Sequence, residues 1–210
     1  MGKTGNIIDI IVEKEWNMFH NTKNTGGQAA CQNDRETFEI MRKSQWMACN
    51  NDILKSYLDD LSKAESSGRN LITEKYAWMM ESTFPEEFED LKETLPEIDP
   101  EKSGIVEKMI PVYLRWREEV DEKYPKISGT GRPLRSSEDS KLVTSVETYF
   151  RGELLTYSLE TLKLYYDYIM ECEEKGINLA NKTLENTAGF YGYSSLEDAE
   201  KKQRNAKGDE

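Results

Sequence analysis

Apolar residues recur at intervals of three and four positions along almost the whole 210-residue chain. In the segment 7–21, this spacing places Ile8, Ile11, Val12 and Phe19 on one side of a helix. No segment shows a convincing alternation of apolar and polar residues at a period of two, which a half-buried strand would need. The spacing therefore predicts an all-α fold, arranged as an orthogonal helical bundle.

Residues that begin or interrupt helices divide this pattern. Asp34 and Asn51 are of the types that cap helix N-termini, and Pro85 suits a first helical turn. Pro111 lies inside an expected helix and should kink or divide it, because proline lacks the N–H that an internal turn needs. The residues 124–137 contain two glycines and two prolines and are the clearest loop. The expected helices span residues 7–21, 35–48, 51–66, 72–82, 85–95, 100–123 and 138–174, with a short one beginning at 196.

The segment 138–174 is predicted to supply the long central helix of the bundle. We expect either one very long helix or two abutting helices, with Gly152 as the weak point. Its apolar residues are Leu154, Leu155, Leu159, Leu162, Tyr165, Tyr166 and Ile169. The chain shows no internal repeat, so we predict a single domain over residues 1–200. A charged, frayed tail is expected over residues 201–210.

The charge and the cysteines bear on partners and compartment. A formal net charge of -12 argues against nucleic acid as the main partner and against an anionic membrane surface, since both attract basic proteins. The three cysteines are widely spaced and form no Cys-x-x-Cys pair, which is typical of reduced thiols in a reducing compartment. No leader segment and no stretch of ~18 apolar residues is visible, so we expect a cytoplasmic location.

The informative polar residues are those that helical spacing turns toward the interior. Glu15 shares the stripe of Ile11 and Phe19, so its carboxylate is expected to point inward. An unpaired buried charge is costly, which leaves two interpretations. Glu15 either forms a structural ion pair with an arginine elsewhere, or acts as a general acid or base in a pocket.

A second group of polar residues lies between positions 147 and 157. Glu147 and Arg151 are one turn apart in the orientation that favours an ion pair, and Glu153 and Tyr157 have the same spacing on the adjoining face. If the pair is buried, the guanidinium of Arg151 could bind a carboxylate or phosphate of a ligand. We therefore predict that Glu147, Arg151 and Tyr157 bind substrate and that Glu153 is catalytic. The alternative is a polar network that only joins helices.

His20 and Cys31 form a third candidate pair. An imidazole next to a thiol lowers the thiol pKa and creates a nucleophile. The thiol of Cys31 would also lie near the helix N-terminus that Asp34 caps, where the helix dipole stabilises a thiolate. The alternative is a loop cysteine and a partly exposed histidine, because the two residues are separated by a loop.

The sequence lacks the residues that several other kinds of functional site require. The chain has one histidine, so the His ligands of a di-iron bundle and the closely spaced ligands of structural zinc are missing, and we predict no metal site. No Walker loop, dinucleotide fingerprint or Gly-x-Ser-x-Gly turn occurs, so no cofactor is assigned. The loop 128–135 has two glycines and two arginines, but it is better explained as a surface connection than as a phosphate site.

Four stretches resemble a bacterial family of about this length, known as a domain of unknown function. They are EKEWNMFHNTKNTGG, CQNDRETFEIMRKSQW, GRNLITEKYAWMMEST and SVETYFRGELLTYS. The resemblance extends from Ile8 to Glu200, nearly the whole chain. It implies a stand-alone helical domain. Some members of that family are fused to, or encoded beside, a domain similar to nucleotidyltransferases, which implies a partner of that kind and assigns no catalytic residue.

Two functions follow as hypotheses. The first is an enzyme that acts on a small polar or anionic metabolite in a pocket between helices, lined by Glu15, Glu147, Arg151 and Glu153, with His20 and Cys31 near its mouth. The second is a non-catalytic helical partner, or substrate-binding module, of a nucleotidyltransferase-like protein. In that case we expect an exposed apolar patch around Trp46, Trp78 or Trp116. A purely structural polar cluster is the third interpretation.

Overall fold

The computed structural model describes residues 3–22, 30–128 and 131–206, and its account of the chain refers to these ranges. They contain ten α-helices and no strand, with an isolated bridge between Ser140 and Val143. The helices are α1 (Lys3–His20), α2 (Arg35–Trp46), α3 (Asn51–Ser66), α4 (Leu71–Thr83), α5 (Pro85–Leu91), α6 (Pro100–Lys123), α7 (Val146–Thr156), α8 (Leu159–Glu174), α9 (Leu179–Phe190) and α10 (Leu196–Ala206). The predicted all-α, single-domain bundle is confirmed.

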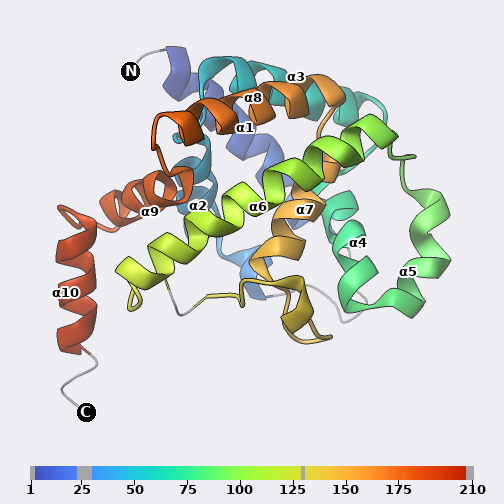
Figure 1. Cartoon of the computed structure of the whole chain (residues 1–210). Coiled ribbons are helices and arrows are strands. Elements are labelled where there is room, and N and C mark those ends of the chain that lie inside the picture. The colour runs from blue at the N-terminus through green and yellow to red at the C-terminus, as the bar shows by residue number, and fades with distance from the viewer. Residues whose placement is uncertain (1–2, 23–29, 129–130, 207–210) are drawn as a thin grey trace.

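The helix α6 crosses the molecule diagonally and packs against α7, α8 and α9 (Figure 1). The helix α3 packs against both α1 and α8, and α4 packs closely against α7. The helices α9 and α10 lie at the C-terminal end of α6 (Figure 1). The core lies where these helices meet, and its largest fully buried side chains are Trp46, Tyr57, Tyr157, Ile11, Ile53, Leu54, Leu61, Met109, Leu114, Leu154, Leu162 and Ile169.

The segment 138–174 differs from the prediction in where its helices begin and end. It contains two helices, α7 and α8, which separate at Tyr157 and Ser158 and not at Gly152. The hydroxyl of Ser158 caps α8 by accepting the N–H of Thr161 at 3.2 Å. Gly152 lies inside α7 because α4 packs directly against it: an added Cβ would lie 3.0 Å from the backbone oxygen of Lys75. Gly152 therefore allows α4 and α7 to approach closely, and it does not end a helix.

The other expectations on where helices begin, end or break have distinct outcomes. Asp34 caps α2 as predicted, but the cap of α3 is Asn50, whose side chain accepts the N–H groups at positions 52 and 53. The helix α6 is not divided at Pro111, and its 24 residues make it the longest described helix. The loop after α6 continues to Ser145, with the short 3-10 helix η3 (Ser136–Glu138) inside it.

The helix α10 extends to Ala206, so it includes residues that we expected in the tail; residues 207–210 lie outside the described part. It is held by the buried side chains of Leu196 and Ala199 and by Glu200, whose carboxylate accepts the backbone N–H groups of Lys126 and Ile127. None of the helices in the described ranges combines the length and the apolar character needed to cross a membrane.

Candidate functional site

Four charged side chains meet in the interior of the bundle, and we call them the ionic core. They are Glu15 of α1, Arg42 of α2, Lys75 of α4 and Glu153 of α7, each at most 6% exposed. Two acids face two bases, so the cluster is formally neutral. The four helices come from distant parts of the chain and are brought together by packing.

Helical spacing explains why these four residues point inward. Each has an apolar or aromatic neighbour four positions before it and another four positions after it, so it shares their helix face. The flanking pairs are Ile11 and Phe19, Phe38 and Trp46, Leu71 and Met79, and Tyr149 and Tyr157.

The guanidinium of Arg42 joins the two carboxylates. Its Nε donates to Glu15 Oε2 at 2.8 Å, and its Nη2 donates to the other oxygen of the same carboxylate. Nη2 and Nη1 also donate to Glu153 at 3.1 and 3.3 Å. This planar, forked donor can serve two acids at once, which an ammonium group could not do with the same geometry.

Neutral side chains satisfy the remaining oxygens of the ionic core. The indole N–H of Trp46 and the hydroxyl of Tyr57 donate to Glu15 at 3.2 and 3.0 Å. The hydroxyl of Tyr157 and the amide of Gln45 donate to Glu153 at 2.9 and 2.8 Å. Both carboxylates are thus fully hydrogen-bonded, as buried charges must be if the fold is to be stable.

Lys75 completes the cluster and links it to the surface loop 131–145. Its Nζ donates to Glu153 Oε2 at 2.6 Å and lies 3.4 Å from the centre of the Tyr149 ring. The guanidinium of Arg132, which is on the exposed loop, lies over the same ring at 4.8 Å. Both contacts are cation–π interactions, so Tyr149 lies between the ionic core and the loop.

The surroundings of Glu153, Tyr57 and Tyr157 shift the pKa values of these three groups. Burial on its own would raise the pKa of the Glu153 carboxyl, but the charges of Arg42 and Lys75 outweigh burial and hold that pKa well below its ordinary value. Burial raises the pKa of the Tyr57 and Tyr157 hydroxyls well above their ordinary value, and the nearby carboxylates add to this. Groups with such shifts do not exchange protons near neutral pH, which favours a structural role over general acid–base catalysis.

The structure separates the predicted site residues into different places. Glu15 and Glu153 belong to the ionic core, and the hydroxyl of Tyr157 donates to Glu153. Glu147 and Arg151 lie on another face of α7, where Arg151 pairs with Glu147 at 2.9 Å and with Glu107 of α6. A carboxylate oxygen of Glu147 also accepts the N–H of Ser136 at 2.9 Å. The guanidinium predicted to bind substrate is therefore engaged by two carboxylates of the protein, away from Glu15.

The proposed nucleophile pair is only partly described. The Nδ1 atom of His20 lies 3.1 Å from the backbone oxygen of Gln32, and its ring lies 5.6 Å from that of Trp16. Cys31 belongs to the short 3-10 helix η1 (Ala30–Asn33), but its side chain lies outside the described residues.

The prediction of an exposed apolar patch around the tryptophans is wrong for two of the three residues. Trp46 and Trp116 are buried, at 0% and 3% exposure, because one donates its indole N–H to Glu15 and the other packs in the core on α6. Trp78 is partly exposed and packs against Phe88 of α5. No exposed patch centred on these tryptophans exists in the described structure.

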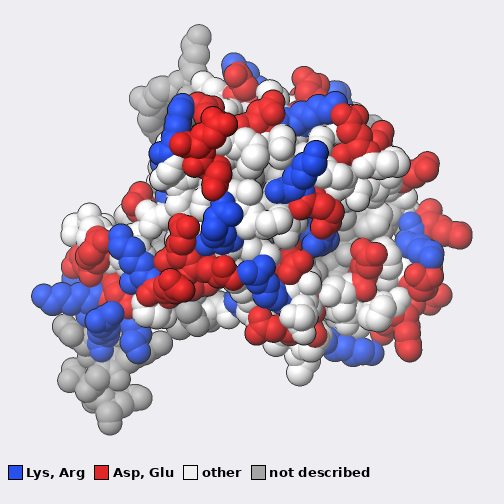
Figure 2. Space-filling view, in the orientation of Figure 1, with Lys and Arg blue, Asp and Glu red and all other residues white. Residues whose placement is uncertain are grey.

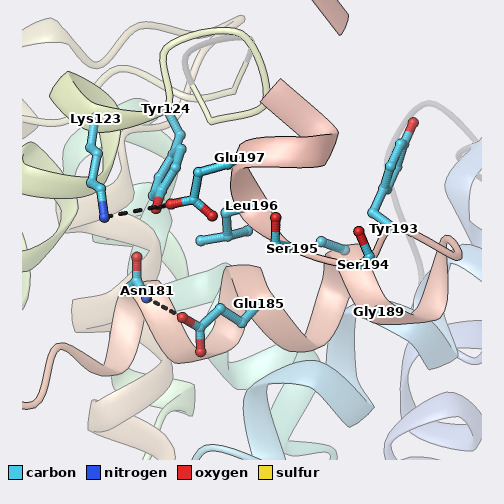
Figure 3. A pocket seen from close by; sticks show the side chains of 11 residues that line it. Lys123, Tyr124, Asn181, Glu185, Gly189, Tyr193, Ser194, Ser195, Leu196 and Glu197 are labelled. Atoms are coloured by element: carbon cyan, nitrogen blue, oxygen red, sulfur yellow. Dashed lines mark hydrogen bonds and ion pairs between the residues drawn. The ribbon is translucent and has the colours of Figure 1, made fainter. Parts of the chain in front are cut away.

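A polar hollow of about 420 Å³ lies at the other end of the molecule, and we call it the α9–α10 pocket. Figure 3 shows carboxylates of Glu185 and Glu197 facing the same space, with Lys123 and Tyr124 at one side and Ser195 at another. The hydroxyl of Tyr124 donates to Glu197 at 2.6 Å, and the amide of Asn181 donates to Glu185 at 2.7 Å. The remaining lining residues are Ala188, Gly189, Tyr193, Ser194 and Leu196.

The pocket was missed by sequence reasoning because its residues come from three separated segments, the end of α6, α9 and the turn before α10. None of these residues interrupts an apolar stripe, so no local signal marked them. A smaller hollow of about 230 Å³ adjoins it and shares Ala188 and Tyr193. Neither hollow is lined by a residue of the ionic core. Within the described ranges, no group of three His, Cys, Asp or Glu side chains could hold a metal ion.

These features define a single-domain helical bundle with a closed ionic core and a separate polar pocket at the surface. The chain belongs to the family described as "Protein of unknown function (DUF4125)", whose model matches residues 5–201. No curated protein and no solved structure matches the chain.

Proposed function

We propose that this chain is a non-catalytic, ligand-binding module, and that the α9–α10 pocket holds a small organic ligand with a primary ammonium group. The observation that carries the proposal is the pair of carboxylates, Glu185 and Glu197, that face one hollow from different elements (Figure 3). The hollow has a volume within the range of metabolite sites, about 300–1,000 Å³.

The charge around the pocket supports a cationic ligand. Figure 2 shows acidic side chains gathered over the C-terminal half of α6 and over α9, with lysines and arginines between them. The chain as a whole carries a net charge of -12, so its field attracts cations. Because Glu185 and Glu197 are exposed to solvent, each ion pair with a ligand should contribute only about 0.2–1 kcal/mol, and binding should weaken as salt is added.

The other hypothesis, an enzyme that uses Glu15 and Glu153, has less support. Both carboxylates are enclosed and already paired with Arg42, and neither described hollow reaches them. The serines of the pocket also have structural tasks, since the hydroxyl of Ser195 caps α10 by accepting the N–H of Asp198. A module that binds a ligand without transforming it would act beside an enzyme, and a nucleotidyltransferase-like protein is the partner that we propose.

Thermal unfolding in the presence of an alkyl diamine tests the ligand class. At ten times its Kd, a ligand stabilises the folded state by about 1.4 kcal/mol, which raises the Tm of a domain of this size by ~3–6 °C. The same diamine acetylated on both nitrogens is neutral and should give no shift. Glu185→Gln with Glu197→Gln should abolish the diamine effect, whereas Asp167→Asn, an exposed carboxylate on α8 outside the pocket, should preserve it.

An equal Tm shift in the native protein, the double variant and Asp167→Asn would overturn the pocket assignment, because the amine would then act through the net negative charge of the whole protein. A shift with carboxylate or phosphate ligands and none with the amine would overturn the ligand class. The partner is tested separately, by co-expression of the full chain with a nucleotidyltransferase-like protein: co-purification of the two is expected, and separate elution would overturn this part of the proposal.

A further inference from the structure

The smaller hollow of about 230 Å³ beside the α9–α10 pocket has a mostly apolar lining. Of the described residues that line it, Lys126 alone is charged, and none is acidic. An apolar cavity of ~150 Å³ is large enough to hold benzene, so this hollow has room for one ring or a short alkyl chain. Its apolar and aromatic lining residues are Ile127, Leu184, Ala188, Tyr191, Tyr193 and Ala199.

The two hollows meet at the turn that ends α9, because Ala188 and Tyr193 line both of them. The N–H of Tyr193 donates to the backbone oxygen of Ala188 at 3.0 Å, and the N–H of Gly192 donates to that of Gly189 at 3.0 Å. Gly192 has a φ of +80°, so the turn is a Schellman motif, which fixes Tyr193 against the end of α9. Figure 3 places Tyr193 at the end of the pocket opposite Lys123. The hollows thus share a fixed border, at which the side chain of Ala188 is only a methyl group.

The charges of the two hollows favour one orientation of an amine ligand. Glu185 and Glu197 face the α9–α10 pocket, where an ammonium group meets opposite charge (Figure 3). In the smaller hollow, an ammonium group would meet Lys126 and no carboxylate of the described lining, and the apolar walls would remove its hydration. The other end of the ligand is therefore expected to be uncharged and apolar.

We infer that the two hollows together bind a monoamine with an apolar chain or ring. The ammonium group lies at Glu185 and Glu197, and the apolar end extends past Ala188 into the smaller hollow. Such a division is usual in metabolite sites, where apolar walls supply contact and a few polar groups set the orientation. This inference rests on the proposed function, because it names the class of amine that the same pocket takes.

The apolar end should supply much of the affinity. Full burial of one methylene group lowers Kd about fourfold. Because Lys126 and Tyr191 are exposed, part of the chain stays hydrated, and we expect a factor of about two to four for each methylene. Pentylamine has three more methylenes than ethylamine, so it should bind about 8- to 60-fold more tightly.

Titration of the full chain with a series of ligands tests the inference, with shifts in amide NMR spectra as the measure of Kd. Pentylamine and diaminobutane have the same length and differ at one end, which is a methyl group or a second ammonium group. Pentylamine should bind severalfold more tightly, although the net charge of -12 attracts the diamine more strongly. Pentanol, which has the chain and no ammonium group, should bind severalfold more weakly than pentylamine.

Tyr191→Ala and Phe190→Ala form a matched pair of variants. Both residues are exposed aromatics at the end of α9, at 53% and 44% exposure, but Phe190 lines neither hollow. Tyr191→Ala should weaken pentylamine binding by about three- to tenfold and leave ethylamine binding unchanged, because it removes apolar wall from the smaller hollow alone. Phe190→Ala should change neither Kd. Leu184→Ala should act as Tyr191→Ala does.

The outcomes separate this inference from the proposed function. Equal Kd values for ethylamine and pentylamine, both raised by Glu185→Gln with Glu197→Gln, would overturn the inference and leave the ammonium site standing. Diaminobutane binding as tightly as pentylamine would do the same. Tighter binding of aminopentanoate than of pentylamine would also overturn the apolar end, because Lys126 would then hold a carboxylate. Pentanol binding as tightly as pentylamine would overturn the ammonium site itself, and the inference with it.

Discussion

Replacing Arg42 with methionine tests whether the ionic core holds the bundle together. The substitution keeps an apolar side chain of similar length and removes all the guanidinium donors that reach Glu15 and Glu153. Glu153 would retain Lys75 at 2.6 Å. Glu15, which is 0% exposed, would lose its cation and keep only the neutral donors Trp46 and Tyr57.

The expected loss is large because one buried carboxylate is left without a cation. Removing one partner of a buried ion pair costs about 3–5 kcal/mol, compared with about 5–15 kcal/mol for the whole free energy of unfolding of a domain. For a chain of this length, that loss lowers the Tm by roughly 6–20 °C. The matched control is Arg115→Met, which removes an exposed ion pair with Glu173 and should cost less than about 1 kcal/mol.

Urea denaturation followed by far-UV circular dichroism measures both variants. Adding Glu15→Gln to Arg42→Met should recover part of the loss, because the second change removes the unpaired buried charge. The reasoning would be refuted if Arg42→Met and Arg115→Met cost the same, or if the double variant were less stable than Arg42→Met alone.

Two further predictions concern the packing and the acid stability of the same region. Gly152→Ala should destabilise the fold by about 1–3 kcal/mol, because the new Cβ would lie 2.9 Å from Met79 Cγ and 3.0 Å from the Lys75 oxygen; a variant as stable as the native protein in urea would contradict this tight contact. Because the folded pKa of Glu153 is lowered, its contribution to stability is fully present above the ordinary glutamate pKa of about 4.3 and is lost as the pH falls below that value. Glu153→Gln should therefore be less stable than the native protein at neutral pH, and its stability should fall less steeply as the pH is lowered. Urea midpoints across a pH series measure both effects. An unchanged slope of stability against pH would argue against the lowered pKa of Glu153.

Most of the helices were predicted because they carry a local signal, but α9 (Leu179–Phe190) was not among the expected helices. Asp34 was recognisable as a cap from its type and position, and Glu15 was recognisable as inward-facing from its place between Ile11 and Phe19. The end of α7 was placed wrongly because glycine was taken as a weak point of the helix. Gly152 instead permits a close contact with Lys75 and Met79, which lie more than 70 positions earlier, and no local pattern displays such a contact.

The partners of Glu15 were not predicted, although a signal for one of them exists. Arg42 lies four positions from both Phe38 and Trp46, which places it on their face of the helix. An inward acid on one helix requires an inward base on another, and this requirement would have selected Arg42. Long-range packing decides which of the chain's many acids and bases meet. The ionic core and the α9–α10 pocket could therefore not be predicted from residue spacing alone.

The order in which the ionic core is synthesised has a consequence for how the chain can fold. Glu153 lies 78 positions after Lys75 and 111 positions after Arg42. On a ribosome, a nascent chain that ends before α7 has one interior acid to neutralise two interior bases, so closing it would bury a net positive charge. We expect α2 and α4 to stay hydrated and accessible to proteases until α7 emerges, which makes completion of the C-terminal half a condition for closure of the N-terminal half.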